Sequence, residues 1–160
     1  CPKYIQRRRL RLEQACSGLL DVRISRALTE QQVGMIAAAD TCFVASMQRD
    51  SGIDVSHRGG RPGFVRVESG TRLRIPDYAG NGMFNTLGNI YASGFAGILV
   101  MDFTQGKQLQ LIGDAGIDWS RTSAAVERSW WLDIQCVRES SLPAGLAWEF
   151  IDASPLNPDA

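Results

Sequence analysis

The 160-residue sequence has no long hydrophobic run and no secretory signal at its start. Its longest apolar stretch, around 97–101, is far short of the ~20 residues that cross a bilayer. We therefore expect a cytoplasmic protein with no membrane contact. Apolar residues make up 44% and charged residues 21% of the chain, which is typical of one globular domain. Because the chain begins with Cys1 rather than methionine, we expect it to be an internal or trimmed piece.

Clustered metal ligands are also missing. The four cysteines stand at 1, 16, 42 and 136, and the chain has a single histidine, His57. This spacing does not support a zinc site, so we predict no metal. Without a secretory signal the thiols are expected to be reduced, with Cys42 and Cys136 in the core. Neither a phosphate-binding P-loop nor a dinucleotide Gly-x-Gly-x-x-Gly motif is present.

The zero net charge hides an asymmetry between the two parts of the chain. Residues 1–28 hold seven Lys/Arg against two Asp/Glu, whereas 29–160 hold ten against fifteen. The run Arg7–Arg11 could bind a nucleic acid, or it could dock on the acidic body or on a partner subunit. We prefer docking and expect no nucleic-acid partner, because no basic groove with interleaved aromatics follows.

Hydrophobic periodicity predicts a mostly β domain with peripheral helices. Thr29 can cap a helix that runs to Ala39, and Met83, Phe84, Leu87, Ile90 and Tyr91 predict a second helix that starts near Asn81–Gly82. The expected strands are 42–46, 53–56, 64–67, 72–75, 97–103, 108–117, 130–139 and 147–151, with 97–103 buried on both faces. So many short strands favour a closed or nearly closed antiparallel barrel. We divide the chain into a basic arm (1–28), a barrel domain (29–154) and a C-terminal linker (155–160).

Polar residues and glycines are concentrated in 54–67 and 75–89. Gly59 and Gly60 would let the backbone approach a ligand, and Arg58 could hold a phosphate or carboxylate. The alternative is a glycine-rich turn with solvated arginines. Asn81, Asn85 and Thr86 add donors near a helix N-terminus, which favours anions, although they could equally serve as caps and surface residues.

Four segments, in order, resemble the pyridoxamine 5′-phosphate oxidase-like family, the FMN-binding split barrels. They are Ala-Asp-Thr-Cys-Phe-Val-Ala-Ser (39–46), Asp-Val-Ser-His-Arg-Gly-Gly (54–60), Pro-Asp-Tyr-Ala-Gly-Asn (76–81) and Phe-Asn-Thr-Leu-Gly-Asn (84–89). The resemblance implies a six-stranded split barrel that binds FMN at a homodimer interface. The start, 1–6, is similar to a junction in longer members of the family.

The resemblance also assigns roles to individual residues. It implies that Ser56, His57, Arg58 and Gly59 lie along the flavin's ribityl chain, phosphate or ring edge, that Asp77 and Tyr78 flank the isoalloxazine ring, and that Gln108 reaches it. Asn81, Asn85 and Thr86 would take the place of the relatives' basic phosphate ligands. Phe84–Asn85 replaces the Arg-Lys pair of true pyridoxamine-phosphate oxidases, so oxidation of pyridoxine phosphate is not expected.

Two functional hypotheses follow. The first is an FMN-dependent oxidoreductase with an unknown small-molecule or electron-donor substrate, in which His57 is the catalytic candidate. The second is a non-catalytic flavin-binding, carrier or dimerisation module, which the neutral phosphate site favours.

Overall fold

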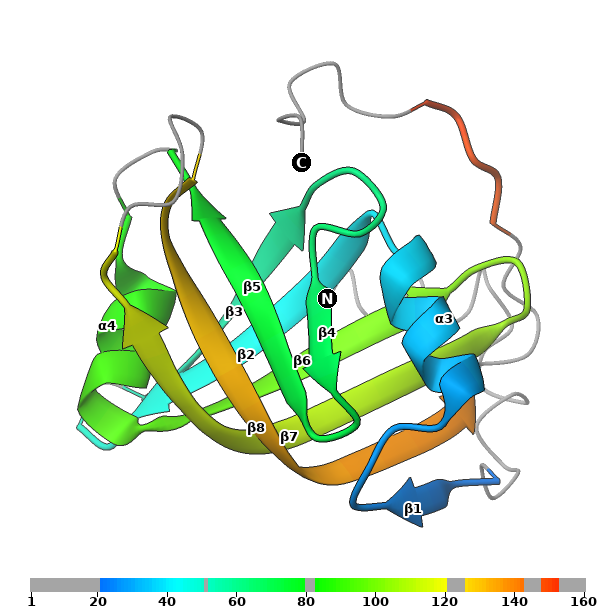
Figure 1. Ribbon diagram of the computed structural model, residues 1–160, viewed down its shortest axis with the longest axis horizontal. Coiled ribbons are helices and arrows are strands. Elements are labelled where there is room, and N and C mark those ends of the chain that lie inside the picture. Colours follow the sequence, from blue (N-terminus) through cyan, green and yellow to red (C-terminus); the bar gives the residue numbers. More distant parts are fainter. Residues whose placement is uncertain (1–20, 51, 80–82, 121–125, 143–147, 153–160) are drawn as a thin grey trace, which may run out of the picture.

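The computed structural model describes residues 21–50, 52–79, 83–120, 126–142 and 148–152, and these contain eight strands and two helices (Figure 1). The expectations for the basic run Arg7–Arg11, for Asn81 and for the C-terminal linker lie outside the described residues. The elements, in chain order, are β1 (Arg23–Ser25), α3 (Glu30–Ala38), β2 (Thr41–Gln48), β3 (Gly52–Gly59), β4 (Arg66–Ser69), β5 (Arg72–Tyr78), α4 (Asn85–Ser93), β6 (Phe95–Asp102), β7 (Lys107–Asp118) and β8 (Val126–Ser141).

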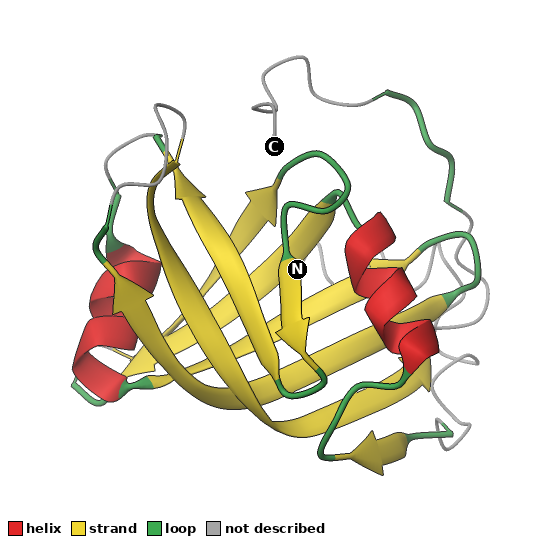
Figure 2. Ribbon diagram, viewed as in Figure 1, coloured by secondary structure: helices red, strands yellow, loops and turns green. Residues whose placement is uncertain are grey.

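All strand pairs are antiparallel and form one curled sheet in the order β3-β2-β6-β7-β8-β5-β4, with β1 added beside β8 (Figure 2). The predicted fold class, a mostly β antiparallel barrel with peripheral helices, is confirmed. Six strands have seven or more residues, while β1 and β4 have three and four. Among the described residues β3 and β4 do not pair with each other, so the barrel is split along this line.

The 16-residue strand β8 connects the two halves of the sheet. It pairs along its length with β7, with β5 and with β1. The register of the β7–β8 pair shifts between Ile112 and Gly113, and such a bulge increases the local bend of a strand. The bulge therefore lets one long strand turn from one wall of the barrel to the other.

The two helices lie toward opposite ends of the curled sheet (Figure 2). The predicted start of α3 is confirmed as a capping box: the Thr29 hydroxyl accepts from the Gln32 amide N–H, and the Gln32 side chain accepts from the Thr29 N–H. The predicted start of α4 near Asn81–Gly82 is wrong, because α4 begins at Asn85. The Arg128 guanidinium lies over the aromatic ring of Phe84, with Arg128 Cζ 4.8 Å from the ring centroid. Phe84 is therefore not part of an apolar helix face.

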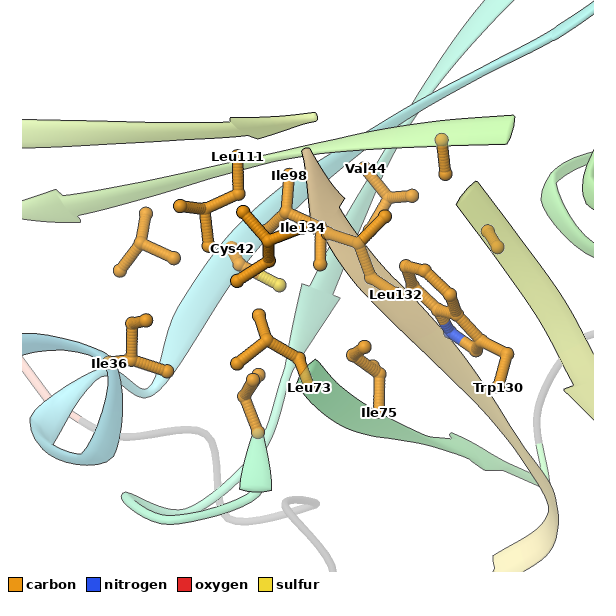
Figure 3. Close-up of a cluster of buried hydrophobic side chains, with 14 of the residues drawn as sticks. Ile36, Cys42, Val44, Leu73, Ile75, Ile98, Leu111, Trp130, Leu132 and Ile134 are labelled. Atoms are coloured by element: carbon orange, nitrogen blue, oxygen red, sulfur yellow. The ribbon is translucent and has the colours of Figure 1, made fainter. Parts of the chain in front are cut away.

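The core lies inside the curled sheet and between the helices (Figure 3). Its largest fully buried side chains include Trp130, Ile36, Leu73, Ile75, Leu132 and Leu111. Cys42 is buried as predicted, whereas Cys136 is only half-buried, so its predicted place in the core is wrong. Strand β6 is buried on one face only, through Ala96, Ile98 and Val100. The expectation of burial on both faces is therefore wrong, because no described element covers the outside of β6. The expected strand at 147–151 is also wrong for its described part, since 148–152 contains no strand.

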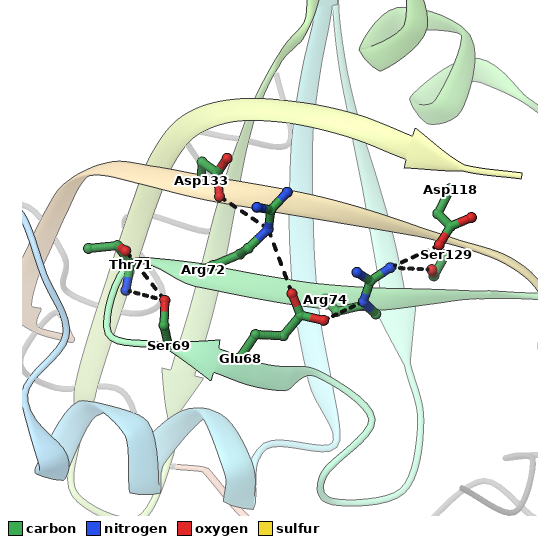
Figure 4. Close-up of polar contacts among 8 residues, drawn as sticks. All are labelled: Glu68, Ser69, Thr71, Arg72, Arg74, Asp118, Ser129 and Asp133. Carbon is green, nitrogen blue, oxygen red and sulfur yellow. Dashed lines mark hydrogen bonds and ion pairs between the residues drawn. The ribbon is translucent and has the colours of Figure 1, made fainter.

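On the outside, ion pairs attach the β4–β5 hairpin to its neighbours (Figure 4). Arg74 of β5 contacts Glu68, the carboxylate of Asp118 at 3.3 Å and the hydroxyl of Ser129 at 3.1 Å. Arg72 Nε lies 3.3 Å from an Asp133 carboxylate oxygen. Exposed pairs of this kind contribute about 0–1 kcal/mol each, so the network chiefly fixes the hairpin's position. Within the described ranges, neither helix is long and apolar enough to cross a membrane.

Candidate functional site

Strand β3 divides the predicted Ser-His-Arg motif between two faces of the sheet. Ser56 and Arg58 pair with Val44 and Cys42 of β2, which are both buried, so these two side chains point into the barrel. His57 pairs with Phe43 and points outward. Side chains alternate along a strand, so three adjacent residues cannot all face the same ligand surface from one side.

Inside the barrel, Asp77 of β5 joins two arginines from different strands. Its side chain accepts from Arg58 Nη1 at 3.1 Å and lies 3.3 Å from Arg128 Nε. Asp77 is 8% exposed. The Arg58–Asp77 pair connects β3 to β5, which are not hydrogen-bonded strands. It therefore bridges the split in the barrel with an ion pair in place of a strand ladder.

The cluster is close to neutral. Arg128 also contacts Glu127, so two guanidinium groups face two carboxylates. Arg58 Nε is buried and has no hydrogen-bond partner among the described residues, as is also true of Arg72 Nε and Trp130 Nε1. A buried donor without an acceptor is costly. The Arg58 side chain as a whole retains 23% exposure, so a ligand oxygen can approach its guanidinium from solvent, although Nε itself is buried.

A chain of hydroxyl groups anchors α4 beside this cluster. The buried Thr86 donates to Ser56 at 3.0 Å, and Ser56 donates to Asp54 at 2.9 Å. Asn89 donates to Ser46 of β2 at 3.1 Å. These contacts bring Ser56, Arg58, Asp77 and Thr86 into one region of the molecule. Asn85 is exposed at the first turn of α4, where its side chain is open to solvent.

His57 and Gln108 lie on the outer face and are separated from that region. His57 Nε2 lies 3.3 Å from the Thr41 hydroxyl, and its ring is 5.5 Å from the ring of Phe43. Gln108 donates to Ser140 of β8 at 3.0 Å. Three strand spacings separate β3 from β7 in the sheet order, which is about 14 Å. One protomer therefore does not bring His57 and Gln108 together.

Two further predicted residues lie at the ends of their strands. Tyr78, the last residue of β5, is half-buried, and burial raises the pKa of its phenol, with Arg66 partly offsetting that effect. Gly59 ends β3, where an added Cβ would lie 3.2 Å from His57 Cε1. Glycine at this position thus keeps room for the histidine ring.

The structure adds Arg128, which the sequence analysis missed. It lies on β8, outside the four motifs, and only the β5–β8 pairing of Asp77 with Arg128 reveals its role. Burial raises the pKa of the Cys42 thiol to about 12, and the nearby Arg58 charge acts in the opposite direction. That thiol is therefore protonated at neutral pH. The described parts of the chain contain no group of three or more potential metal-ligating side chains.

The outside of the β2–β3–β6 wall presents an apolar surface. We call it the outer apolar face and define it by Phe43, Ala45, Met47, Ile53, Val55 and Leu99. Ile53 is 77%, Val55 62% and Met47 43% exposed. Contiguous exposed apolar side chains commonly mark an interaction site.

Comparison with solved structures identifies the fold. The chain is similar to HupZ from Group A Streptococcus, with 13% sequence identity over 76% of this chain and 99% of HupZ and a TM-score of 0.55. It is equally similar to a putative pyridoxamine 5′-phosphate oxidase from Lactobacillus delbrueckii, with 16% identity over 71% and 94% of the two chains and a TM-score of 0.55. The sequence matches no family model and no curated protein. The chain thus has the split-barrel fold of pyridoxamine 5′-phosphate oxidase-like proteins.

Proposed function

We propose that this chain is an FMN-binding flavoprotein and an oxidoreductase whose substrate is unknown. The observation that carries the proposal is the buried, unpartnered Arg58 Nε in the split of the barrel, on a fold shared with a putative pyridoxamine 5′-phosphate oxidase. A phosphate or flavin carbonyl oxygen is an acceptor that such a donor requires. The residues present therefore fit an anionic, oxygen-rich cofactor.

In this proposal Arg58 binds the cofactor, and Asp77, which pairs with the Arg58 guanidinium, competes with the ligand for it. Ser56 and Thr86 already bond to each other, so they support the wall of the site and hold α4 in place. The exposed Asn85 amide and the half-buried Tyr78 phenol are the remaining groups able to contact the ligand. FMN would supply the hydride or electron transfer, and the cationic guanidinium would favour the reduced, anionic ring.

We further propose that the outer apolar face forms a homodimer interface, with FMN bound between the subunits. Exposed aliphatic side chains on a sheet face gain free energy when a second copy covers them. His57 lies on this face, so in the dimer it would face the partner subunit and not its own Arg58. Strand β3 is at an edge of the sheet, so a cofactor bound between the subunits at this edge could contact Arg58 of one protomer from the split and His57 of the other from the outer face.

Titration with FMN tests cofactor binding, followed by the flavin absorbance near 450 nm. Arg58→Met keeps the aliphatic stem and removes the donors, and it should weaken FMN binding by about 1.5–3 kcal/mol, because hydrogen bonds to charged groups contribute that much. Arg74→Met is the matched control, since Arg74 is also paired with carboxylates but lies in the outer network. Equal losses in both variants, or no binding by the native protein, would refute the proposal.

Sedimentation velocity tests the dimer with another matched pair. Ile53→Glu places a charge in the outer apolar face, and we expect it to yield monomers. Ile24→Glu changes an equally exposed isoleucine, 68% against 77%, on β1, and the dimer should persist. A native protein that sediments as a monomer at micromolar concentration would contradict the interface.

A non-catalytic flavin-binding or carrier module is the second candidate. It is favoured by the location of His57, the only catalytic candidate, on the opposite face from Arg58. Stopped-flow mixing of the FMN-loaded protein with NAD(P)H or dithionite separates the two functions. Rapid reduction that slows in His57→Gln, with little change in FMN affinity, supports the oxidoreductase. Bound FMN that neither reagent reduces supports the carrier.

A further inference from the structure

Away from the candidate site, a groove runs along α3. Its near part, about 250 Å³, lies between α3 and the end of β8 and reaches Glu139. Its larger part, about 1040 Å³, continues past the β6–β7 turn to the segment 148–152. Met35, Ala38, Asp102 and Gln105 line both parts, so the two form one continuous depression, which we call the α3 groove.

The α3 groove combines acidic side chains with exposed aromatic rings. Asp40, Asp102, Glu149 and Asp152 line its larger part, and Glu139 and Lys107 line its near part. Within the described ranges, none of the four carboxylates in the larger part forms an ion pair.

The aromatic wall of the groove suits a particular kind of cation. The rings of Phe103 and Trp148 contact each other at 4.8 Å between centroids, and Trp148 is half-exposed. Arginine stacks on aromatic faces while its guanidinium pairs with carboxylates. The groove therefore fits an arginine-rich peptide segment with apolar residues between its charges.

The chain itself carries such a segment at 7–11, and the first described strand after it, β1, lies beside the groove. The segment Arg7-Arg8-Arg9-Leu10-Arg11 belongs to the arm 1–28, whose net charge of +5 balances the net charge of −5 on residues 29–160. In the β1–β8 strand register Arg23 lies opposite Glu139, which is at the near end of the groove. Arg11 and the described Asp21 are ten Cα–Cα steps apart, which span at most about 35 Å, whereas the nine-residue helix α3 is about 14 Å long.

We propose that the α3 groove is the intramolecular docking site of residues 7–11. In the docked state the arginines pair with the groove carboxylates and stack on Trp148 and Phe103, and Leu10 contacts the methionines of the groove. In the docked state the arginines would already be paired with groove carboxylates, so the arm would not bind a polyanion. This proposal does not depend on flavin binding, because the groove shares no residue with the Arg58–Asp77 cluster.

Zero-length carbodiimide crosslinking of the full chain tests the docking. Arg9→Lys keeps the charge and supplies an amine, and peptide mapping by mass spectrometry locates the carboxylates to which it couples. We expect coupling to Asp40, Asp102, Glu149 or Asp152. Coupling that favours the distant exposed carboxylates Asp50 and Asp114 would overturn the proposal. In a mixture of light and isotope-labelled chains, crosslinks that form only between two different molecules would also overturn it.

Native-state trypsin cleavage at residues 7–11 gives an independent measurement. Glu149→Gln/Asp152→Asn should raise the cleavage rate about threefold or more, since the arm loses exposed ion-pair partners. About 0.5 M salt should do the same to the native protein by screening. The matched control Asp50→Asn/Asp114→Asn removes the same charge elsewhere and should leave the rate unchanged. The proposal would be overturned if both double variants changed the cleavage rate equally, or if the groove substitutions left the cleavage rate unchanged.

Discussion

Replacing Asp77 by asparagine should strongly destabilise the fold. Among the residues that the structure describes, Asp77 is the one carboxylate that contacts both Arg58 and Arg128, at 3.1 and 3.3 Å. Asparagine keeps the size of the side chain and one acceptor oxygen but removes its charge. The two guanidinium groups would then be left close together, with only Glu127 beside one of them.

The structure sets the size of this effect. Removing one partner from a buried ion pair costs about 3–5 kcal/mol. The Arg58 and Arg128 side chains retain 23% and 16% exposure, so water partly solvates the unpaired charges. We therefore expect Asp77→Asn to lower the free energy of unfolding by about 2–4 kcal/mol. Asp133→Asn is the matched control: Asp133 pairs with Arg72 at 3.3 Å but is 45% exposed, and its loss should cost about 0–1 kcal/mol.

Urea unfolding monitored by tryptophan fluorescence and circular dichroism measures both variants. Arg128→Met in the Asp77→Asn background should recover part of the loss, because it removes one of the unpaired charges. Equal destabilisation by Asp77→Asn and Asp133→Asn would refute the idea that the cluster bridges the split. Additive effects of Asp77→Asn and Arg128→Met would refute the charge argument.

Three further substitutions and one pH series test the fold. Gly113→Ala should destabilise the fold by at least about 2 kcal/mol, because the added Cβ would lie 1.9 Å from the Asp133 carbonyl oxygen. Gly34→Ala in α3 should stabilise the fold by about 0.5–1 kcal/mol, because its Cβ would meet nothing within 4 Å. The urea midpoints of both variants measure these changes. Leu132→Ala, which truncates a fully buried side chain, should cost about 2–5 kcal/mol in the same assay. The Cys42 pKa is raised from 9.0 to about 12, so its contribution to stability is complete below pH 9.0 and is lost as pH rises toward 12. Thermal melts of the native protein and Cys42→Ala should therefore converge in that range, and parallel curves would contradict the raised pKa.

Much of the fold could be predicted because its elements carry local signals. Thr29 and Gln32 form a capping box that the sequence already contains, and alternation located the long strands to within a few residues. The errors arose where apolar residues are not buried in the core. Met83 and Phe84 continue a helical pattern but are exposed before α4 begins, and the apolar run of β6 has one uncovered face.

The candidate site was less predictable, because it depends on strand pairing. The sequence marks Arg58 and Asp77 through glycine-rich and turn-like surroundings, yet their contact follows only from the curl that brings β3 toward β5. Arg128 has no local signal at all, since its importance comes from its register opposite Asp77. The contiguous Ser56-His57-Arg58 motif suggested one surface, whereas the pleat separates His57 from its neighbours.

The charge balance of the cluster makes stability and cofactor affinity oppose each other. The charges of Arg58 and Arg128 are already matched by those of Asp77 and Glu127, so the native site offers an incoming phosphate hydrogen-bond donors but little net charge attraction. Asp77→Asn should fold less stably yet bind FMN more tightly, because an anionic ligand then replaces the missing carboxylate. Part of the lost stability should return when FMN is added, by ligand linkage. Calorimetric titration and thermal melts with and without FMN measure both quantities. Weaker FMN binding by Asp77→Asn would mean that Asp77 serves to orient Arg58 for the ligand rather than to compete with it.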